Sequence, residues 1–188
     1  LEERGIEVVL VNARHVKNLP GRKTDVSAAA WLAQLGAHGL LRGSSVPPEP
    51  IRQLRDLTRT RTTLVRERAR EIQRLEKLLE DAGTKLSSVA TDITGVSGRA
   101  MLEALIAGRR DPTELAELAK RRLRSKIPAL TEALTGRFAE HHAFLARLHL
   151  DLIDQHSRAV EELTARIQVV IEPFRGARDL MITIPGIS

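Results

Sequence analysis

Asp25 stands at the start of a helix predicted over residues 25–37, where an acidic side chain has two possible uses. A carboxylate there accepts hydrogen bonds from free N–H groups of the first turn, and the helix dipole favours its charge. Acids three residues apart on a helix are also neighbours and can share one Mg²⁺ ion for phosphodiester chemistry. The residue three positions on is Ala28, which has no carboxylate. Local chemistry therefore favours a helix cap at Asp25, with a metal ligand as the alternative.

Other candidate catalytic groups are weaker. His142, His149 and His156 recur at seven-residue steps, so they share one helix face. Seven residues span about 10.5 Å along a helix, which is too far for one ion to bridge. We interpret these histidines as polar positions of a helix interface. Ser97 lies in a Gly-Val-Ser-Gly sequence without a preceding strand, which indicates a helix start rather than a nucleophile elbow.

Arginine dominates residues 51–82, which contain eight arginines and one lysine. Arg binds phosphate in a bidentate manner and stacks on bases, which Lys does not. Residues 51–137 hold 19 basic and 12 acidic residues, a net charge of +7, and would meet a polyanion. The alternative is a solvated surface on which Glu67, Glu71 and Glu76 pair with the arginines. The candidate nucleic-acid-binding residues are Arg52, Arg55, Arg59, Arg66, Arg70, Arg74, Arg121, Arg122, Arg124 and Lys126.

The elements that must position these residues are mainly helical. Residues 6–12 form a β-branched run that predicts a short buried strand. Apolar residues at three- and four-residue steps predict long helices over about 51–82 and 138–172. Pro50 suits the first turn of the earlier helix, and Gly83 suits the position after its end.

Two helices of this length require long partners, so we expect them to pack antiparallel, alone or with a second copy. Short helices predicted over 98–108, 111–120 and 127–136 would cap the turn between them. The apolar stripe of the later helix comprises Phe138, His142, Leu145, Leu148, Leu152, Val160, Leu163, Ile167, Val170 and Ile171.

The amino-acid composition limits the classes of protein to which this chain can belong. Aromatic residues make up only 2% of the chain, so its core must be built from aliphatic side chains, which suits helices and coiled coils. The sequence has no cysteine, which excludes disulfides and Cys-based zinc sites. No apolar run approaches the roughly 18 residues of a membrane span, so no membrane partner is expected.

Several stretches resemble, in the same order, the insertion sequence 110 family of transposases, which are bridge-RNA-guided DNA recombinases. These stretches are ARHVKNLPGRKTDVSAAAWLAQL (13–35), IRQLRDLTRTRTTLVRERAREIQRLEKLLEDAG (51–83), DITGVSGRAMLEALIAGRRDP (92–112), LRSKIPALTEALTG (123–136) and TIPGIS (183–188). The resemblance implies that Asp25 is the third acid of an Asp-Glu-Asp-Asp metal site, and that Ala28 stands where the fourth is expected. The first two acids and the nucleophilic serine of the family are expected outside this sequence.

The resemblance also implies three regions. Residues 1–46 would be the C-terminal part of a RuvC-like, RNase H-fold domain. Residues 47–179 would be a helical linker and coiled coil that dimerises and contacts RNA. Residues 180–188 would begin a C-terminal transposase domain. We therefore expect a fragment or inactive copy of a transposase that keeps nucleic-acid binding and dimerisation.

The expected partners are DNA, structured bridge RNA and further copies of the chain, in the cytoplasm of a prokaryote at the nucleoid. Mg²⁺ serves the intact family, and none is expected to bind this chain. Two alternatives remain. One is a purely structural coiled-coil module, and the other is a regulatory module that pairs with an intact transposase.

Overall fold

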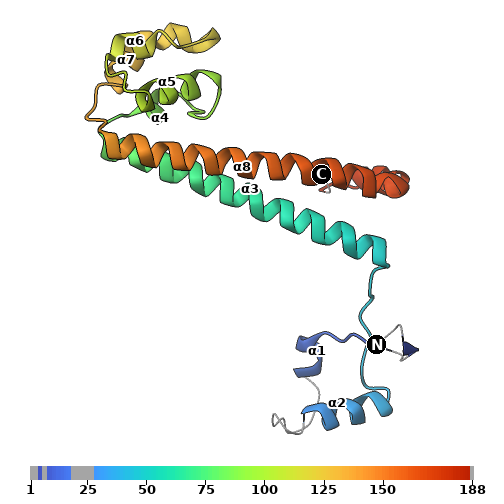
Figure 1. The fold of residues 1–188 in the computed structure, drawn as a ribbon. Coiled ribbons are helices and arrows are strands. Elements are labelled where there is room, and N and C mark those ends of the chain that lie inside the picture. The colour runs from blue at the N-terminus through green and yellow to red at the C-terminus, as the bar shows by residue number, and fades with distance from the viewer. Residues whose placement is uncertain (1–3, 6–7, 18–27, 187–188) are drawn as a thin grey trace. The chain divides into compact units, whose positions relative to one another are not determined.

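The structure is a computed structural model and describes residues 4–5, 8–17 and 28–186 (Figure 1). The chain divides into two compact units, Leu1–Arg52 and Gln53–Ser188, with the division in the second turn of a long helix. Because the placement of one unit relative to the other is not determined, each unit is described by itself.

The first unit contains two short helices, α1 (Ala13–Lys17) and α2 (Ala28–Ala37). The helix predicted over 25–37 is thus confirmed from Ala28 onward, and its first residues lie outside the described part. Val16 and Leu35 are the buried hydrophobic side chains described in this unit. The expected remnant of an RNase H-like domain stays a prediction.

The strand predicted over residues 6–12 is wrong for the part that the structure describes. Val8, Val9 and Leu10 are 44–56% exposed instead of buried. Pairing is limited to one antiparallel bridge between Val11 and Gly43, beside a hydrogen bond of 2.7 Å from the Ser44 N–H to the Leu10 carbonyl. A strand needs a neighbouring backbone along its length, and a β-branched run without such a neighbour stays extended but unpaired.

The second unit is built on two long antiparallel helices, α3 (Glu49–Asp81) and α8 (Glu140–Ile171) (Figure 1). Glu71 contacts His149, and Arg61 donates a hydrogen bond of 2.8 Å to Thr164. Residues nearer the N-terminus of α3 therefore contact residues nearer the C-terminus of α8, as in an antiparallel pair. The two predicted long helices and their antiparallel packing are confirmed. A coiled coil in the strict sense stays a prediction.

Local signals place the end of α3. Gly83 has φ +74°, a conformation that glycine adopts without the steric penalty of a side chain. Its N–H donates to the Glu80 carbonyl, and the Thr84 N–H donates to the Leu79 carbonyl, both at 2.8 Å. This pair of bonds is a Schellman motif, which satisfies the last carbonyls of a helix. Gly83 is therefore the helix stop that the sequence predicts.

A small helical cap, residues 84–138, joins the two long helices. Within it, Asp111 is the N-terminal capping residue of α6, because its carboxylate accepts a hydrogen bond of 2.8 Å from the Thr113 N–H. Figure 1 shows α8 between this cap and α3. The elements of the cap are α4 (Leu86–Val89), α5 (Val96–Ile106), α6 (Pro112–Ala116), the 3-10 helix η2 (Arg121–Lys126) and α7 (Ile127–Ala133).

The main core lies where the cap meets the long helices. Fully buried aliphatic side chains from α3, the cap and α8 form one cluster, which explains why the short cap helices are stable despite their length. Its members include Leu75, Leu79, Leu86, Ile93, Met101, Leu102, Leu105, Leu115, Leu130, Ala146 and Leu150.

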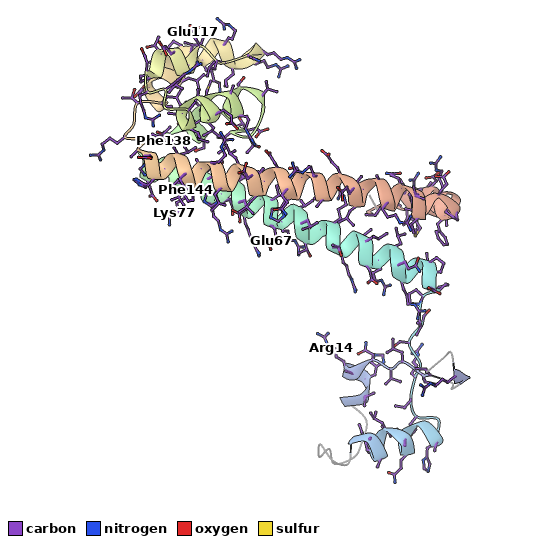
Figure 2. The ribbon with its side chains drawn as sticks, viewed as in Figure 1. Arg14, Glu67, Lys77, Glu117, Phe138 and Phe144 are labelled. Atoms are coloured by element: carbon purple, nitrogen blue, oxygen red, sulfur yellow. The ribbon has the colours of Figure 1, made fainter. Side chains whose placement is uncertain are left out.

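The predicted apolar stripe of α8 is wrong at Leu148, which is 47% exposed, and its neighbour Phe144 is 71% exposed (Figure 2). The face that carries Ala146 and Leu150 is buried instead. Periodicity alone cannot separate the two faces, because α8 has contacts with both α3 and α5.

The long helix ends before Pro173, as predicted. The 3-10 helix η3 (Glu172–Phe174) and the helix α9 (Arg175–Ile182) follow. The region boundary predicted at residue 180 falls inside α9. Within the part of the chain that the structure describes, no helix is long and apolar enough to cross a membrane.

Candidate nucleic-acid interface

The predicted metal ligand Asp25 lies outside the described residues. Ala28 is the first residue of α2, and alanine has no oxygen ligand for a cation. Mg²⁺ prefers several carboxylate and water oxygens, so the donors at positions 25 and 28 do not fit a two-acid half-site. Among the residues that the structure does describe, no three His, Asp or Glu residues lie together as a metal-binding group.

The arginines of α3 form a stripe along one side of the helix. Arg52, Arg55, Arg59, Arg66 and Arg70 are separated by steps of three, four, seven and four residues, which return to the same face. All five are exposed. From the first to the last, the stripe extends for roughly 27 Å at 1.5 Å per residue. A regular row of cations of this length can follow a nucleic-acid backbone.

Ion pairing divides the arginines of α3 into two groups. Arg70 pairs with Glu67 at 2.6 Å, and Arg74 pairs with Glu71. These pairs confirm the alternative of paired surface arginines at the end of α3 next to the cap. By contrast, Arg55, Arg59 and Arg66 have no carboxylate within ion-pair distance among the described residues. Their charges are available to an external polyanion.

Short threonines separate the unpaired arginines. A shallow depression on α3 is lined by Thr58, Arg59, Thr62, Thr63 and Arg66. The hydroxyls of Thr58, Thr62 and Thr63 donate to carbonyls three or four residues earlier, at 2.9–3.1 Å. Each hydroxyl oxygen therefore remains an acceptor only, and the side chains stay close to the helix. The result is a gap between Arg59 and Arg66 in which a phosphate group can approach the helix.

The second predicted basic group, residues 121–126, forms η2 in the cap. Arg121, Arg122, Arg124 and Lys126 are all exposed. Arg124 pairs with Glu117 at 3.3 Å, and the Lys126 ammonium donates to the Val89 carbonyl at 3.1 Å. Because α8 lies between the cap and α3 (Figure 1), the structure does not bring η2 and the arginine stripe into one surface.

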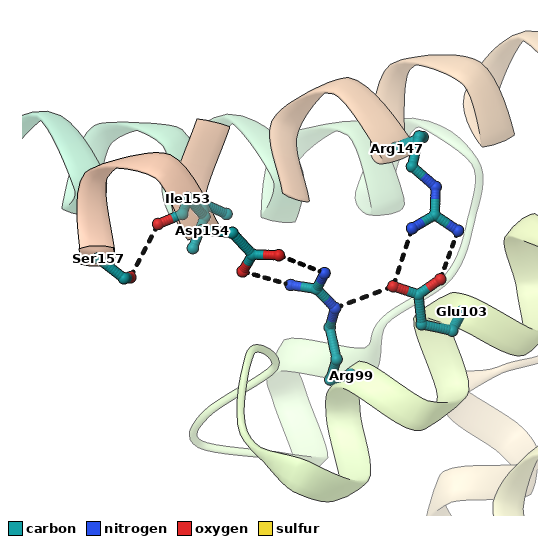
Figure 3. Close-up of polar contacts among 6 residues, drawn as sticks. All are labelled: Arg99, Glu103, Arg147, Ile153, Asp154 and Ser157. Carbon is teal, nitrogen blue, oxygen red and sulfur yellow. Dashed lines mark hydrogen bonds and ion pairs between the residues drawn. The ribbon is translucent and has the colours of Figure 1, made fainter. Parts of the chain in front are cut away.

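Four charged residues attach the cap to α8, and sequence reasoning missed their arrangement (Figure 3). Arg99 on α5 donates to both carboxylate oxygens of Asp154 on α8, at 2.9 and 2.7 Å. Glu103 accepts from Arg99 at 3.0 Å and from both terminal nitrogens of Arg147. The contacts run from Asp154 to Arg99, on to Glu103 and then to Arg147, so they connect α5 to α8 at two places. The two positive and two negative charges of these residues balance.

The pKa directions agree with this network. The bond to Asp154 raises the pKa of Arg99 above its ordinary value, and the bond to Glu103 does the same for Arg147. The Arg147 guanidinium, followed by Arg99, lowers the pKa of the Glu103 carboxyl, while burial opposes this effect. All three shifts favour the charged forms, so the network is intact at neutral pH.

Of the three histidines at seven-residue steps on α8, His142 and His149 contact different partners. The His149 Nδ1 lies 2.9 Å from a Glu71 carboxylate oxygen, inside the α3–α8 interface. The His142 Nδ1 accepts a hydrogen bond of 3.0 Å from the Ala139 N–H and so caps α8. The structure therefore confirms an interface position at His149 and gives His142 a capping function. Glu71, which is only 5% exposed, could have been recognised as an interface residue because it lies four residues before the buried Leu75.

Residues 1–84 of the chain match the family model DEDD_Tnp_IS110, which is described as a transposase. The match includes α1, α2 and all of α3, and therefore the whole arginine stripe. No curated protein and no solved structure matches the chain.

Proposed function

We propose that the chain binds nucleic acid during DNA transposition through the arginine stripe of α3, and the match of residues 1–84 to the insertion sequence 110 transposase family model supports this proposal. The single observation that carries the proposal is the unpaired state of Arg55, Arg59 and Arg66 on one exposed helix face. Unpaired cations release counterions from nucleic acid without first breaking an ion pair of the protein.

The match to a transposase family model supports DNA as a partner, and we propose structured RNA as the second one. Arginine guanidinium groups bind phosphates of either nucleic acid, so the stripe itself does not distinguish them. The threonine gap between Arg59 and Arg66 supports contact with a backbone rather than with base edges, because its side chains are short and lie against the helix.

The test compares two double variants that each remove two exposed positive charges from a long helix. Arg55→Ala with Arg59→Ala changes the stripe, whereas Arg158→Ala with Arg166→Ala changes exposed residues of α8. Affinity for a duplex DNA and for a structured RNA is measured at several salt concentrations. The stripe variant is expected to lower the slope of log affinity against log salt by about two, and the α8 variant to leave it nearly unchanged. Equal effects of both double variants would show non-specific attraction and contradict the proposal.

We propose that strand transfer does not proceed at positions 25 and 28 of this chain, because Ala28 removes one of the two adjacent acids. The purified chain should show no recombination of a cognate DNA substrate in Mg²⁺, and measurable recombination would contradict this. The Asp25→Asn substitution in a full-length active relative with aspartate at position 28 separates the functions of Asp25. Asparagine caps a helix about as well as aspartate but binds Mg²⁺ poorly.

A second candidate function is assembly with another copy of the chain or with an intact transposase. The exposed pair Phe144 and Leu148, one turn apart on α8, supports this candidate, because large apolar side chains rarely adjoin on a free surface. The double variant Phe144→Asp with Leu148→Asp should lower the molar mass measured by light scattering. Val169→Asp, at a 65% exposed position farther along α8, is the matched control. A molar mass that is the same in wild type and double variant would exclude this surface.

A further inference from the structure

The cap contains a cavity of about 470 Å³ that is separate from the arginine stripe. It lies between the turn that leads into α5 and the first residues of η2. Its size falls in the range of small-ligand sites, and it combines apolar walls with a few polar groups. The residues that matter for its chemistry are Asp92, Val96, Ser97, Lys120, Arg121 and Leu123.

One wall of this cavity is a rigid turn. One oxygen of Asp92 accepts three hydrogen bonds of 2.8–3.0 Å, from the Thr94 N–H, the Thr94 hydroxyl and the Gly95 N–H. Gly98 packs so closely on this turn that an added Cβ would lie 2.3 Å from the Ile93 carbonyl oxygen. The other Asp92 oxygen has no hydrogen-bond partner among the described residues, so it can accept from a ligand.

The lining of this cavity also contains two basic residues, Lys120 and Arg121. The Lys120 N–H donates to the Ser97 hydroxyl oxygen at 2.9 Å, which ties these two parts of the lining together and leaves the Ser97 hydroxyl hydrogen available. Arg121 has φ +53°, which is uncommon for a residue with a side chain. The side chains of Lys120 and Arg121 have no carboxylate within ion-pair distance among the described residues. Two unpaired cations and one carboxylate therefore line the same cavity.

The apolar part of the cavity is unusually accessible. Among the lining residues, Val96 is 71% exposed and Leu123 is half-buried. A planar ring between these side chains would cover both of them.

We propose that this cavity binds one unpaired nucleotide of a single-stranded nucleic acid. Lys120 and Arg121 bind its phosphate, Val96 and Leu123 contact the base, and Asp92 accepts a hydrogen bond from an exocyclic amino group. The proposal rests on the proposed function for its nucleic-acid partner, but it names a different surface and adds base selectivity. A carboxylate accepts from the cytosine amino group but faces an oxygen acceptor in uracil or thymine. Bases of a duplex are paired and cannot enter.

The experiment measures fluorescence anisotropy of the full chain with labelled hexanucleotides at pH 7.5. The probes are six cytosines, six uracils and six abasic units in RNA, and six cytosines and six thymines in DNA. The cytosine strand is expected to bind roughly tenfold more tightly than the uracil strand and than the abasic strand. The RNA and DNA pairs show which backbone the site accepts.

Asp92→Asn is the decisive variant. Asparagine keeps an oxygen to accept from the turn, but it replaces the free carboxylate oxygen with an amide donor. The preference for cytosine should therefore be lost or inverted. Arg121→Gly keeps a backbone conformation with positive φ. It should weaken binding of the cytosine strand and of the uracil strand equally, and it should lower the slope of log affinity against log salt by about one.

Val96→Glu tests the same cavity without touching the turn, because Val96 is exposed. It should abolish the cytosine preference, whereas Val169→Glu on α8 should not. The stripe variant Arg55→Ala with Arg59→Ala should weaken all strands and leave their ratio unchanged, so failure of the stripe and failure of the cavity are distinguishable. Equal binding of cytosine, uracil and abasic strands, or a ratio that survives Asp92→Asn and Val96→Glu, would overturn the proposal.

Discussion

Glu71 on α3 and His149 on α8 meet in the interface of the long helices, with 2.9 Å between a carboxylate oxygen and Nδ1. Because an ionised carboxylate only accepts, the His149 Nδ1–H is the donor. Glu71 also accepts from Arg74, and its side chain is almost fully buried. This contact fixes which residues of the two helices face each other, in an interface that is otherwise mostly aliphatic.

Removing the Glu71 carboxylate should destabilise the protein more than removing an exposed one. Glu71→Ala leaves the partly buried Nδ1–H of His149 without an acceptor, which costs about 1–3 kcal/mol in free energy of unfolding. Glu67→Ala, which breaks only the exposed pair with Arg70, should cost less than about 0.5 kcal/mol. Urea unfolding followed by circular dichroism compares the two variants. Equal losses would show that Glu71 contributes no more than a surface ion pair.

Arg99 and Asp154 should be energetically coupled. Arg99→Ala, Asp154→Ala and the double variant form a cycle in which we expect a coupling free energy of about 1 kcal/mol, since the pair is bidentate but partly exposed. Each single variant should also increase the rate of amide hydrogen exchange in α5, because α5 opens more often. Additive effects of the two substitutions would mean that the aliphatic core alone holds the cap on α8.

The stability of the start of α8 should depend on pH through His142. Burial, followed by the neighbouring His141, lowers the pKa of His142 below its ordinary value of 6.5, against a small opposing effect of Asp81. The folded state therefore prefers the neutral ring, which can accept the Ala139 N–H. This contribution is fully present above pH 6.5 and is lost as the pH falls through the lower pKa of the folded state.

His142→Gln is the informative variant for this pH dependence. Glutamine at this position of the first turn can still accept the capping hydrogen bond, but it does not titrate. Thermal unfolding at pH 7.5 and pH 5.5 should therefore differ less in His142→Gln than in the wild type. An unchanged difference between the two pH values would assign the dependence to another group.

Replacing Gly83 and replacing Gly176 by alanine should have opposite effects on the free energy of unfolding. At Gly83 an added Cβ has room, with its nearest contact at 3.7 Å, but the positive φ opposes a side chain. Gly83→Ala should lower the free energy of unfolding by about 1 kcal/mol. Gly176 lies inside α9 in open space, so Gly176→Ala should be neutral or stabilising by a few tenths to about 1 kcal/mol. Differential scanning calorimetry of both variants checks the signs.

Local sequence signals determined the elements of this protein. Apolar residues at three- and four-residue steps predicted the two long helices. Gly83 marks the end of α3, Pro173 marks the end of α8, and Asp111 marks the start of α6. Each of these residues acts through its own backbone conformation or through the nearest N–H groups, so its effect can be recognised in the sequence. The same steps, together with helix length, required an antiparallel partner. The positions of the arginines on one face of α3 also followed from the sequence, because helix geometry is fixed.

Tertiary structure decided what each face contacts. Residues 8–10 have strand-forming side chains, but a strand also requires a neighbouring backbone, which local sequence does not encode. Leu148 and Leu150 are chemically alike, yet only packing against the cap buries Leu150. Charge along α3 did not reveal which arginines are paired, because Glu71 turns into the interface and pairs with Arg74, while Arg55 and Arg59 form no ion pair among the described residues although Asp56 is nearby in the sequence. Periodicity encodes where side chains lie on a helix, whereas burial and pairing depend on residues distant in the chain.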